Sequence, residues 1–210
     1  MTAPDPRPLL TRALDQVGDL VAATPPEALT APTPCDDWDV RALLAHLVGV
    51  HRRIAHVGGG GLFSEVSTMP ALADDRIAPE LVAARADVDR TWGLGSVDSS
   101  DGSDVPVLDR ELTVPWGTMA GRFVGFGYVQ ELTVHAWDLA AATGRTEVLD
   151  DALAAAIEDT AHQVLPAKPR GGPIPFGPPV PAAPDAAPTT RLVAWLGRDP
   201  AFAPGTLADR

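Results

Sequence analysis

The sequence predicts an all-α fold, a helical bundle followed by a proline-rich C-terminal segment that wraps against it. Apolar residues recur at helical spacing through much of the first 165 residues, little of the chain alternates as strands do, and residues 166–190 contain nine prolines. A chain of 210 residues that is 45% hydrophobic can bury an ordinary core. We therefore expect a helical domain at 1–165 and a proline-rich tail at 166–210, with a short helix at 191–196.

Three helices are predicted in the first half of the chain. Residues 7–23 carry leucine, alanine and valine at helical spacing and end at a pair of prolines. A second helix is expected to open at Trp38-Asp39, with Asp39 as its N-cap, and to run to about Val57. A third is expected to start with Pro79 at the first helical position and to end at Trp92.

The second half begins less regularly and then becomes helical again. Residues 93–105 have no hydrophobic period and predict a surface loop, and Val107–Val114 predicts a short strand or hairpin arm. Thr118 is a candidate cap for a long helix at 119–142, and a fifth helix is expected at 150–165. Glycine is costly inside a helix, so three glycines in the first half of the long helix indicate close approach of another backbone or a ligand: Gly121, Gly125 and Gly127.

Charge and cysteine content exclude several classes of protein. The chain has 28 acidic and 16 basic side chains and a net charge of -12, which disfavours binding to nucleic acid or to an anionic membrane. The apolar run at 43–50 is too short to span a bilayer, and the N-terminus does not resemble a secretory signal. The single cysteine, Cys35, excludes an intramolecular disulfide and cysteine-rich zinc sites and suits a reducing compartment. We expect a cytoplasmic monomer or homodimer.

The long fourth helix carries polar residues on its core-facing side. Glu131, His135 and Asp138 are spaced four and three residues apart, so they form one row on the helix beside apolar positions. A carboxylate and an imidazole one turn apart can bind a single cation, as two histidines at the same spacing do in helical zinc sites.

A third ligand is available on the second helix. His46 lies within the apolar stripe of that helix and is expected to point inward, whereas His51 and His56 are expected to face elsewhere. With Glu131 and His135 it would give two nitrogens, one oxygen and an open coordination position, as catalytic zinc sites have. The alternative, an exposed Glu131–His135 ion pair and a core histidine at position 46, remains open on spacing alone.

Two segments carry a family resemblance. Residues 33–49, TPCDDWDVRALLAHLVG, resemble the signature TPC-x-x-W-x-V-R-x-L-x-x-H-x-x-G of actinobacterial DinB-like metal-binding proteins, a family that includes the metal-binding domain of mycothiol-dependent maleylpyruvate isomerase. Residues 131–140 resemble the second motif of that family, E-x-x-x-H-x-W-D-L. Residues 176–180 and 196–200 look like the end of the same family.

The resemblance implies a DinB-like four-helix bundle that holds a divalent metal, usually zinc, on His46, Glu131 and His135. Nickel, iron and manganese accept similar ligands. It also implies mycothiol as a low-molecular-weight thiol co-substrate, bound through the open metal position, and an enzyme that is a thiol S-transferase or isomerase acting on a small electrophile. The isomerase has a separate C-terminal domain, whereas about 45 residues follow the fifth helix here, so the substrate does not carry over.

Two further residues are candidate catalytic groups. Asp138 could orient a metal ligand or act as a base, and it could equally be a solvated helix residue. Arg85 could bind an anionic substrate, or lay its stem along the core with its head in water. Cys35 is expected to hold its loop rather than to react. A metal-dependent hydrolase that uses bound water, and a non-catalytic module that binds a metal or small ligand, remain alternative functions.

Overall fold

The computed structural model describes residues 4–35, 37–94, 107–170 and 176–204, and within them the predicted all-α class is confirmed. No helix of the described residues combines the length and apolarity that crossing a membrane requires. Most of the predicted loop at 93–105 lies outside the described residues. The α-helices are α1 (Arg7–Ala22), α2 (Val40–Gly58), α3 (Asp74–Trp92), α4 (Gly121–Ala142), α5 (Asp151–Val164) and α6 (Pro188–Trp195).

The chain divides into two compact units. Unit 1 comprises Met1–Ala22 and Leu44–Val129, and unit 2 comprises Ala23–Leu43 and Gln130–Arg210. Unit 1 therefore holds α1, most of α2, α3 and the first part of α4, and unit 2 holds the rest of α4 with α5 and α6. The predicted boundary after residue 165 stays a prediction.

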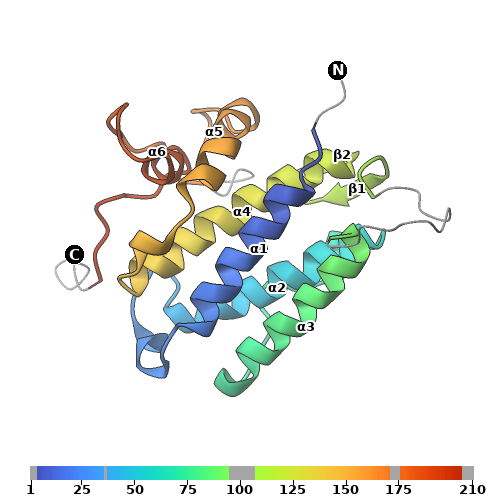
Figure 1. The fold of residues 1–210 in the computed structure, drawn as a ribbon, viewed down its shortest axis with the longest axis horizontal. Coiled ribbons are helices and arrows are strands. Elements are labelled where there is room, and N and C mark those ends of the chain that lie inside the picture. The colour runs from blue at the N-terminus through green and yellow to red at the C-terminus, as the bar shows by residue number, and fades with distance from the viewer. Residues whose placement is uncertain (1–3, 36, 95–106, 171–175, 205–210) are drawn as a thin grey trace. The chain divides into compact units, whose positions relative to one another are not determined.

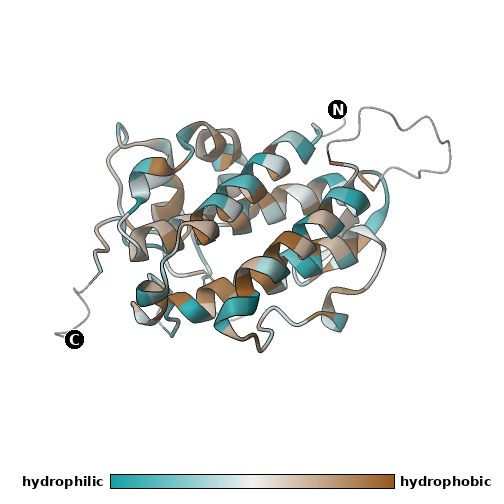
Figure 2. Ribbon diagram, turned by 60° about the horizontal axis from the view of Figure 1, so that its bottom comes forward, coloured by the Kyte–Doolittle hydropathy of each residue, from teal (hydrophilic) through white to brown (hydrophobic). Residues whose placement is uncertain are grey.

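The core of unit 1 forms where amphipathic helices meet. Hydrophobic and hydrophilic residues alternate along the helices as their sequence periods predict (Figure 2). The helices α1 and α3 contact one another, with α2 beside them (Figure 1). Trp92, at the end of α3, is fully buried and donates its indole N–H to the carbonyl of Ile54 on α2 at 2.9 Å. This hydrogen bond satisfies the one polar atom of the largest buried side chain in the core.

The glycines of α4 lie where other segments approach the helix: the predicted approach of another backbone is found at Gly121, whereas side chains approach Gly125 and Gly127. A Cβ at Gly121 would overlap the carbonyl of Val107, and one at Gly125 would lie 2.6 Å from Pro6 Cγ. A Cβ at Gly127 would lie 2.8 Å from the Trp116 ring. Each contact requires hydrogen in place of a side chain, which outweighs the low helix propensity of glycine.

Three predicted helix starts are wrong, among them that of α6, which begins at Pro188 rather than at residue 191. The helix α3 begins at Asp74, so Pro79 lies inside the helix rather than at its first position, and two aspartates occupy the first turn, where negative charge is favourable. Thr118 and Met119 belong to a hairpin instead of α4, because β1 (Glu111–Val114) pairs in antiparallel fashion with β2 (Gly117–Ala120). The backbone of these residues is used by the ladder, and α4 starts only at Gly121.

The expectation that His51 faces away from the core is also wrong. Only 1% of the surface of His51 is exposed, because α2 is buried around most of its circumference in unit 1. The Nδ1–H donates to the carbonyl of Leu47 at 2.7 Å, one turn earlier. Burial, together with the charge of Arg85, lowers the pKa of His51 to about 4 despite this hydrogen bond, so the ring is neutral near pH 7.

Unit 2 is held together by contacts between α5 and α6. Asp150 caps α5 by accepting the backbone N–H of Leu153 at 3.0 Å. Arg191 of α6 donates to both carboxylate oxygens of Glu158 on α5, at 2.8 and 2.6 Å. The rings of His162 and Trp195 stack with their centroids 4.0 Å apart.

Short 3-10 turns complete the described elements: η1 (Pro26–Thr30), η2 (Phe63–Glu65) and η3 (Thr146–Val148).

We predict that Gly49→Ala destabilises the protein by about 1–3 kcal/mol. Gly49 lies inside α2, and an added Cβ would meet three backbone atoms of Thr68 at 2.5–2.6 Å. Backbone cannot rotate aside as a side chain can. Gly18→Ala in α1 is the matched control, because nothing lies within 4 Å of its Cβ position, and it should stabilise the fold by up to about 1 kcal/mol. Urea unfolding of the two variants measures both effects, and equal stabilities would contradict the packing assigned to Gly49.

The low pKa of His51 predicts a pH dependence of stability. The unfolded chain takes up this proton near pH 6.5, whereas the folded protein does so only near pH 4. The contribution of neutral His51 is therefore fully present above pH 6.5 and is lost as the pH falls to about 4, by roughly 3 kcal/mol.

The His51→Gln variant isolates this contribution. Its free energy of unfolding should vary less than that of the unchanged protein between pH 7 and pH 4, because glutamine does not titrate. The other charged groups around the ring, Arg85 on α3 and Asp15 and Asp19 on α1, are the same in both proteins. Parallel pH profiles would show that the burial of His51 does not set its pKa.

Candidate functional site

A tight turn before α2 presents Cys35 to the rest of unit 2. The Thr33 hydroxyl donates to the carbonyl of Trp38 at 2.8 Å and accepts the backbone N–H of Cys35 at 3.1 Å. Asp39 then caps α2, as predicted, by accepting the backbone N–H of Ala42 at 2.8 Å. The turn is therefore fixed by hydrogen bonds on both sides of Cys35. Asp36, within the same motif, lies outside the described residues.

Asp138 of α4 is the centre of the polar network in unit 2. Its residue is 0% exposed. Arg198 donates its Nε–H to Oδ1 at 2.8 Å and an Nη2–H to Oδ2 at 2.9 Å, which makes the pair bidentate. The Oδ2 atom also accepts from Cys35 Sγ at 3.1 Å and from His135 Nδ1 at 2.9 Å. Both carboxylate oxygens are therefore engaged.

The segment after α6 aims Arg198 at this carboxylate. Gly197 has φ = +83°, a left-handed conformation that favours glycine, and its backbone lies against Gly177. The backbone N–H of Arg198 then bonds to the carbonyl of Val193 at 2.9 Å, which closes the end of α6. The chain reversal lets a side chain 60 residues away in sequence reach Asp138.

Burial and pairing act in opposite directions on the charges of this network. Burial by itself raises the pKa of Asp138, but the hydrogen bonds from His135 and Arg198 and the charge of Arg198 outweigh it and lower the pKa to about 2. The same pairing outweighs burial and raises the pKa of Arg198. Burial and the neighbouring Asp138 carboxylate raise the pKa of the Cys35 thiol. Near pH 7 the network therefore holds an ionised carboxylate, a guanidinium and a protonated thiol.

His135 is oriented by Asp138. Because ionised Asp138 can only accept, the proton between the two groups lies on Nδ1, and in the neutral ring the lone pair is then on Nε2. The His135 side chain is 12% exposed, so the ring is largely enclosed. Glu131, one turn earlier on α4, places a carboxylate oxygen within 4.8 Å of a ring nitrogen of His135. Sequence spacing correctly predicted that Glu131, His135 and Asp138 share one side of α4.

A second set of candidate ligand atoms lies in the same unit. Single donor atoms of Cys35, His135 and Asp138 all lie within 4.8 Å of one another. A metal there would have to displace the proton of a thiol whose pKa is raised, next to a guanidinium that already neutralises the carboxylate. The set therefore fits a structural network better than a metal site, which agrees with the structural role expected for Cys35.

The remaining two candidate residues belong to unit 1. His46 is 7% exposed on α2, as its place in the apolar stripe predicted. Arg85 of α3 donates its Nε–H to Asp89 at 2.8 Å and an Nη1–H to Asp15 of α1 at 2.6 Å. These ion pairs leave the catalytic role of Arg85 untested, and it stays a prediction.

Sequence reasoning did not find Arg198. The signal was present, because Arg198 lies in the segment 196–200 that resembles the end of the family. A role could not be assigned from that resemblance, since the contact with Asp138 depends on how the chain returns after α6. The sequence also gave no reason to connect Cys35 with Asp138.

Comparisons with known proteins show which proteins this chain resembles. Residues 10–140 match the family model described as the mycothiol maleylpyruvate isomerase N-terminal domain. Two proteins of Mycobacterium tuberculosis, Uncharacterized protein Rv0738 and Uncharacterized protein MT0763, are each 29% identical to this chain over 195 residues, 92% of this chain and 98% of theirs.

The helical fold is also similar to that of a solved enzyme. The crystal structure of mycothiol-dependent maleylpyruvate isomerase matches with a TM-score of 0.55 and 14% identity, over 74% of this chain and 66% of the isomerase chain. A structure of a single-residue variant of that enzyme matches equally well. At this identity the likeness shows the DinB-like fold alone. The family model, which spans more than half of the sequence, shows that the chain belongs to the mycothiol maleylpyruvate isomerase N-terminal domain family.

Proposed function

We propose that this protein is a divalent-metal-dependent enzyme that uses mycothiol to attack a small electrophile, as a thiol S-transferase or an isomerase. His46, Glu131 and His135 would hold the metal, with zinc the first expectation and nickel an alternative. The family supports the use of mycothiol, because the solved relative is a mycothiol-dependent isomerase. The presence of a single cysteine in the sequence fits a reducing, cytoplasmic location.

The observation that carries this proposal is the 2.9 Å hydrogen bond from His135 Nδ1 to Asp138. Histidines that bind metals typically donate their other ring N–H to a carboxylate, which fixes the tautomer and makes the ligand nitrogen more basic. Here the carboxylate is ionised and bonded through both oxygens, so in the neutral ring Nε2 would be the nitrogen that binds the metal. Glu131, one turn away, supplies a carboxylate oxygen as a second ligand beside the His135 nitrogen.

The side chains around His135 have separate roles in this proposal. Asp138 acts as a positioning residue rather than as a base, because a carboxylate with a pKa of about 2 and two engaged oxygens is a poor proton acceptor. Arg198 keeps that carboxylate ionised and fixed. The ring of Trp38 lies with its centroid 6.0 Å from that of His135 and forms an apolar wall on this side of the imidazole.

The bound metal would supply a lowered pKa for a thiol or water at its open coordination position, so that the nucleophilic anion forms near pH 7. The chain itself supplies the orientation of the ligands and the exclusion of water around them. The proposed substrate is a small molecule with an electrophilic carbon. Arg85 stays a secondary proposal for binding an anionic substrate, which would have to compete with Asp15 and Asp89 for the guanidinium.

We predict that protein purified without a metal-affinity tag contains about one zinc or nickel ion per chain. Elemental analysis of His46→Ala, Glu131→Ala and His135→Ala should show that each variant loses most of the metal, because a three-ligand site does not tolerate the loss of one donor. His56→Ala is the matched control, since the exposed His56 ring bonds to Glu65 on the surface. Full metal content in the three ligand variants would overturn the proposed site.

The same preparation tests the use of a thiol. Cobalt-substituted protein should develop a thiolate-to-metal charge-transfer band on addition of mycothiol, and the band should be absent in His135→Ala. An unchanged spectrum in metal-loaded protein would contradict the thiol-dependent mechanism. If metal-loaded protein with an unchanged spectrum still hydrolyses a substrate, the function is that of a metal-dependent hydrolase. If it shows no turnover, the function is that of a non-catalytic binding module.

A further inference from the structure

A pocket of about 450 Å³ opens between α1 and α3 of unit 1. Its size is within the range of small-molecule sites. Aliphatic side chains form most of its wall, with Leu14 and Val21 from α1 and Leu81 and Val82 from α3. Val82 is 70% exposed, so an apolar side chain stands at the rim with little else covering it. All lining residues belong to unit 1, so the pocket shares no residue with the network around Asp138.

His51 of α2 contributes a buried polar atom to this pocket. Its Nδ1–H is committed to the carbonyl of Leu47 at 2.7 Å, so Nε2 carries a lone pair and can only accept. Among the described residues, no protein group donates to Nε2. His51 is 1% exposed and lines the pocket, so a donor for this acceptor would have to come from the pocket. The atom calls for a ligand that carries an N–H or O–H group.

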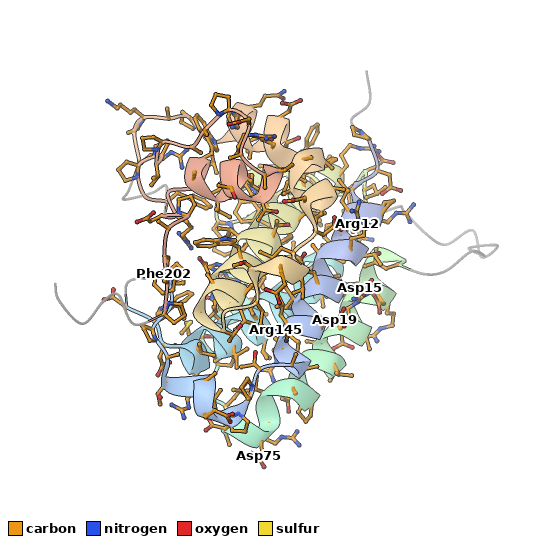
Figure 3. The ribbon with its side chains drawn as sticks, turned by 60° about the vertical axis from the view of Figure 1, so that its left-hand side comes forward. Arg12, Asp15, Asp19, Asp75, Arg145 and Phe202 are labelled. Atoms are coloured by element: carbon orange, nitrogen blue, oxygen red, sulfur yellow. The ribbon has the colours of Figure 1, made fainter. Side chains whose placement is uncertain are left out.

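The second polar feature is an unneutralised negative charge on α1. Asp15 and Asp19 lie on successive turns of this helix, where Figure 3 labels both. Asp15 is paired with Arg85 at 2.6 Å, whereas Asp19 has no ion pair within the described residues. Asp19 also lies in the last turn of α1, which contains no basic residue, beside carbonyls at the negative end of the helix dipole. Asp19 is exposed, so water solvates its carboxylate, and the negative end of the helix dipole adds to its attraction for a bound cation.

We propose that the pocket binds a small organic amine in its ammonium form, with the charged nitrogen on Asp19, an N–H donated to His51 Nε2, and an apolar body against the aliphatic wall. The lining carries one carboxylate in excess of its single guanidinium, which matches one positive charge. The three N–H groups of a primary ammonium are sufficient for two acceptors at once.

Two other ligand classes fit less well. An anion would have to displace Asp15 or Asp89 from the Arg85 guanidinium, which already donates to both carboxylates. A divalent metal prefers several oxygen ligands and would face a guanidinium and an aliphatic wall. The pocket therefore favours a ligand that has both a positive charge and an apolar body.

Benzylamine, benzyl alcohol and benzoate are matched probes, because they share a ring and differ in charge. We expect saturable binding of benzylamine by NMR titration of the full chain, with weaker binding of benzyl alcohol and none of benzoate. Asp19→Asn should weaken benzylamine at least roughly tenfold, since it removes a charge-assisted hydrogen bond. Asp75→Asn, the same charge change at a residue of α3 outside the pocket lining, should leave the affinity unchanged (Figure 3).

A second variant tests the location without disturbing the buried histidine. Val82→Lys places an ammonium at the exposed rim, where it can reach the carboxylate, and should abolish benzylamine binding while the fold is retained. The proposal is overturned if benzylamine does not bind saturably, if Asp19→Asn and Asp75→Asn weaken it equally, or if benzoate binds better than benzylamine.

Discussion

The ion pair between Asp138 and Arg198 is the interaction on which the candidate site depends. A carboxylate with no exposed surface is stable only when its charge is balanced and its lone pairs are used. Arg198 provides the balance through two hydrogen bonds, and Cys35 and His135 use the remaining capacity. Removing Arg198 alone would leave a buried, unpaired charge, which typically costs about 3–5 kcal/mol. The turn before α2, the helix α4 and the segment after α6 are joined at this one carboxylate.

This arrangement separates the tasks of neighbouring carboxylates on α4. Asp138 is ionised and buried, and both of its oxygens accept hydrogen bonds, so its remaining function is to orient the side chains that donate to it. Glu131 is less buried and lies one turn away beside His135, where its carboxylate is the oxygen ligand of the proposed metal site. Two acidic residues seven positions apart thus differ in chemistry because their surroundings differ. The same logic explains why Cys35, although close to both groups, stays a protonated thiol.

Helical spacing was sufficient to predict what lies on a single helix, and insufficient for what joins several segments. The row of Glu131, His135 and Asp138 followed from spacings of four and three residues. Arg198 did not follow, because its contact depends on a chain reversal at a glycine with positive φ. The start of α3 was also misplaced: Pro79 is typical of a first turn, but the aspartates before it are equally good first-turn residues and extend the helix.

The central claim, that Asp138 fixes the proton of His135 on Nδ1, can be measured directly by ¹⁵N NMR of the histidine rings in metal-free protein near pH 7. His135→Gln assigns the signals by removing one set. The ring of His135 should show the Nδ1–H tautomer with an unprotonated Nε2, and Asp138→Asn should reduce this preference. An Nε2–H tautomer, or a ring protonated on both nitrogens, would contradict the account, because Nε2 would then not be held ready to bind a metal.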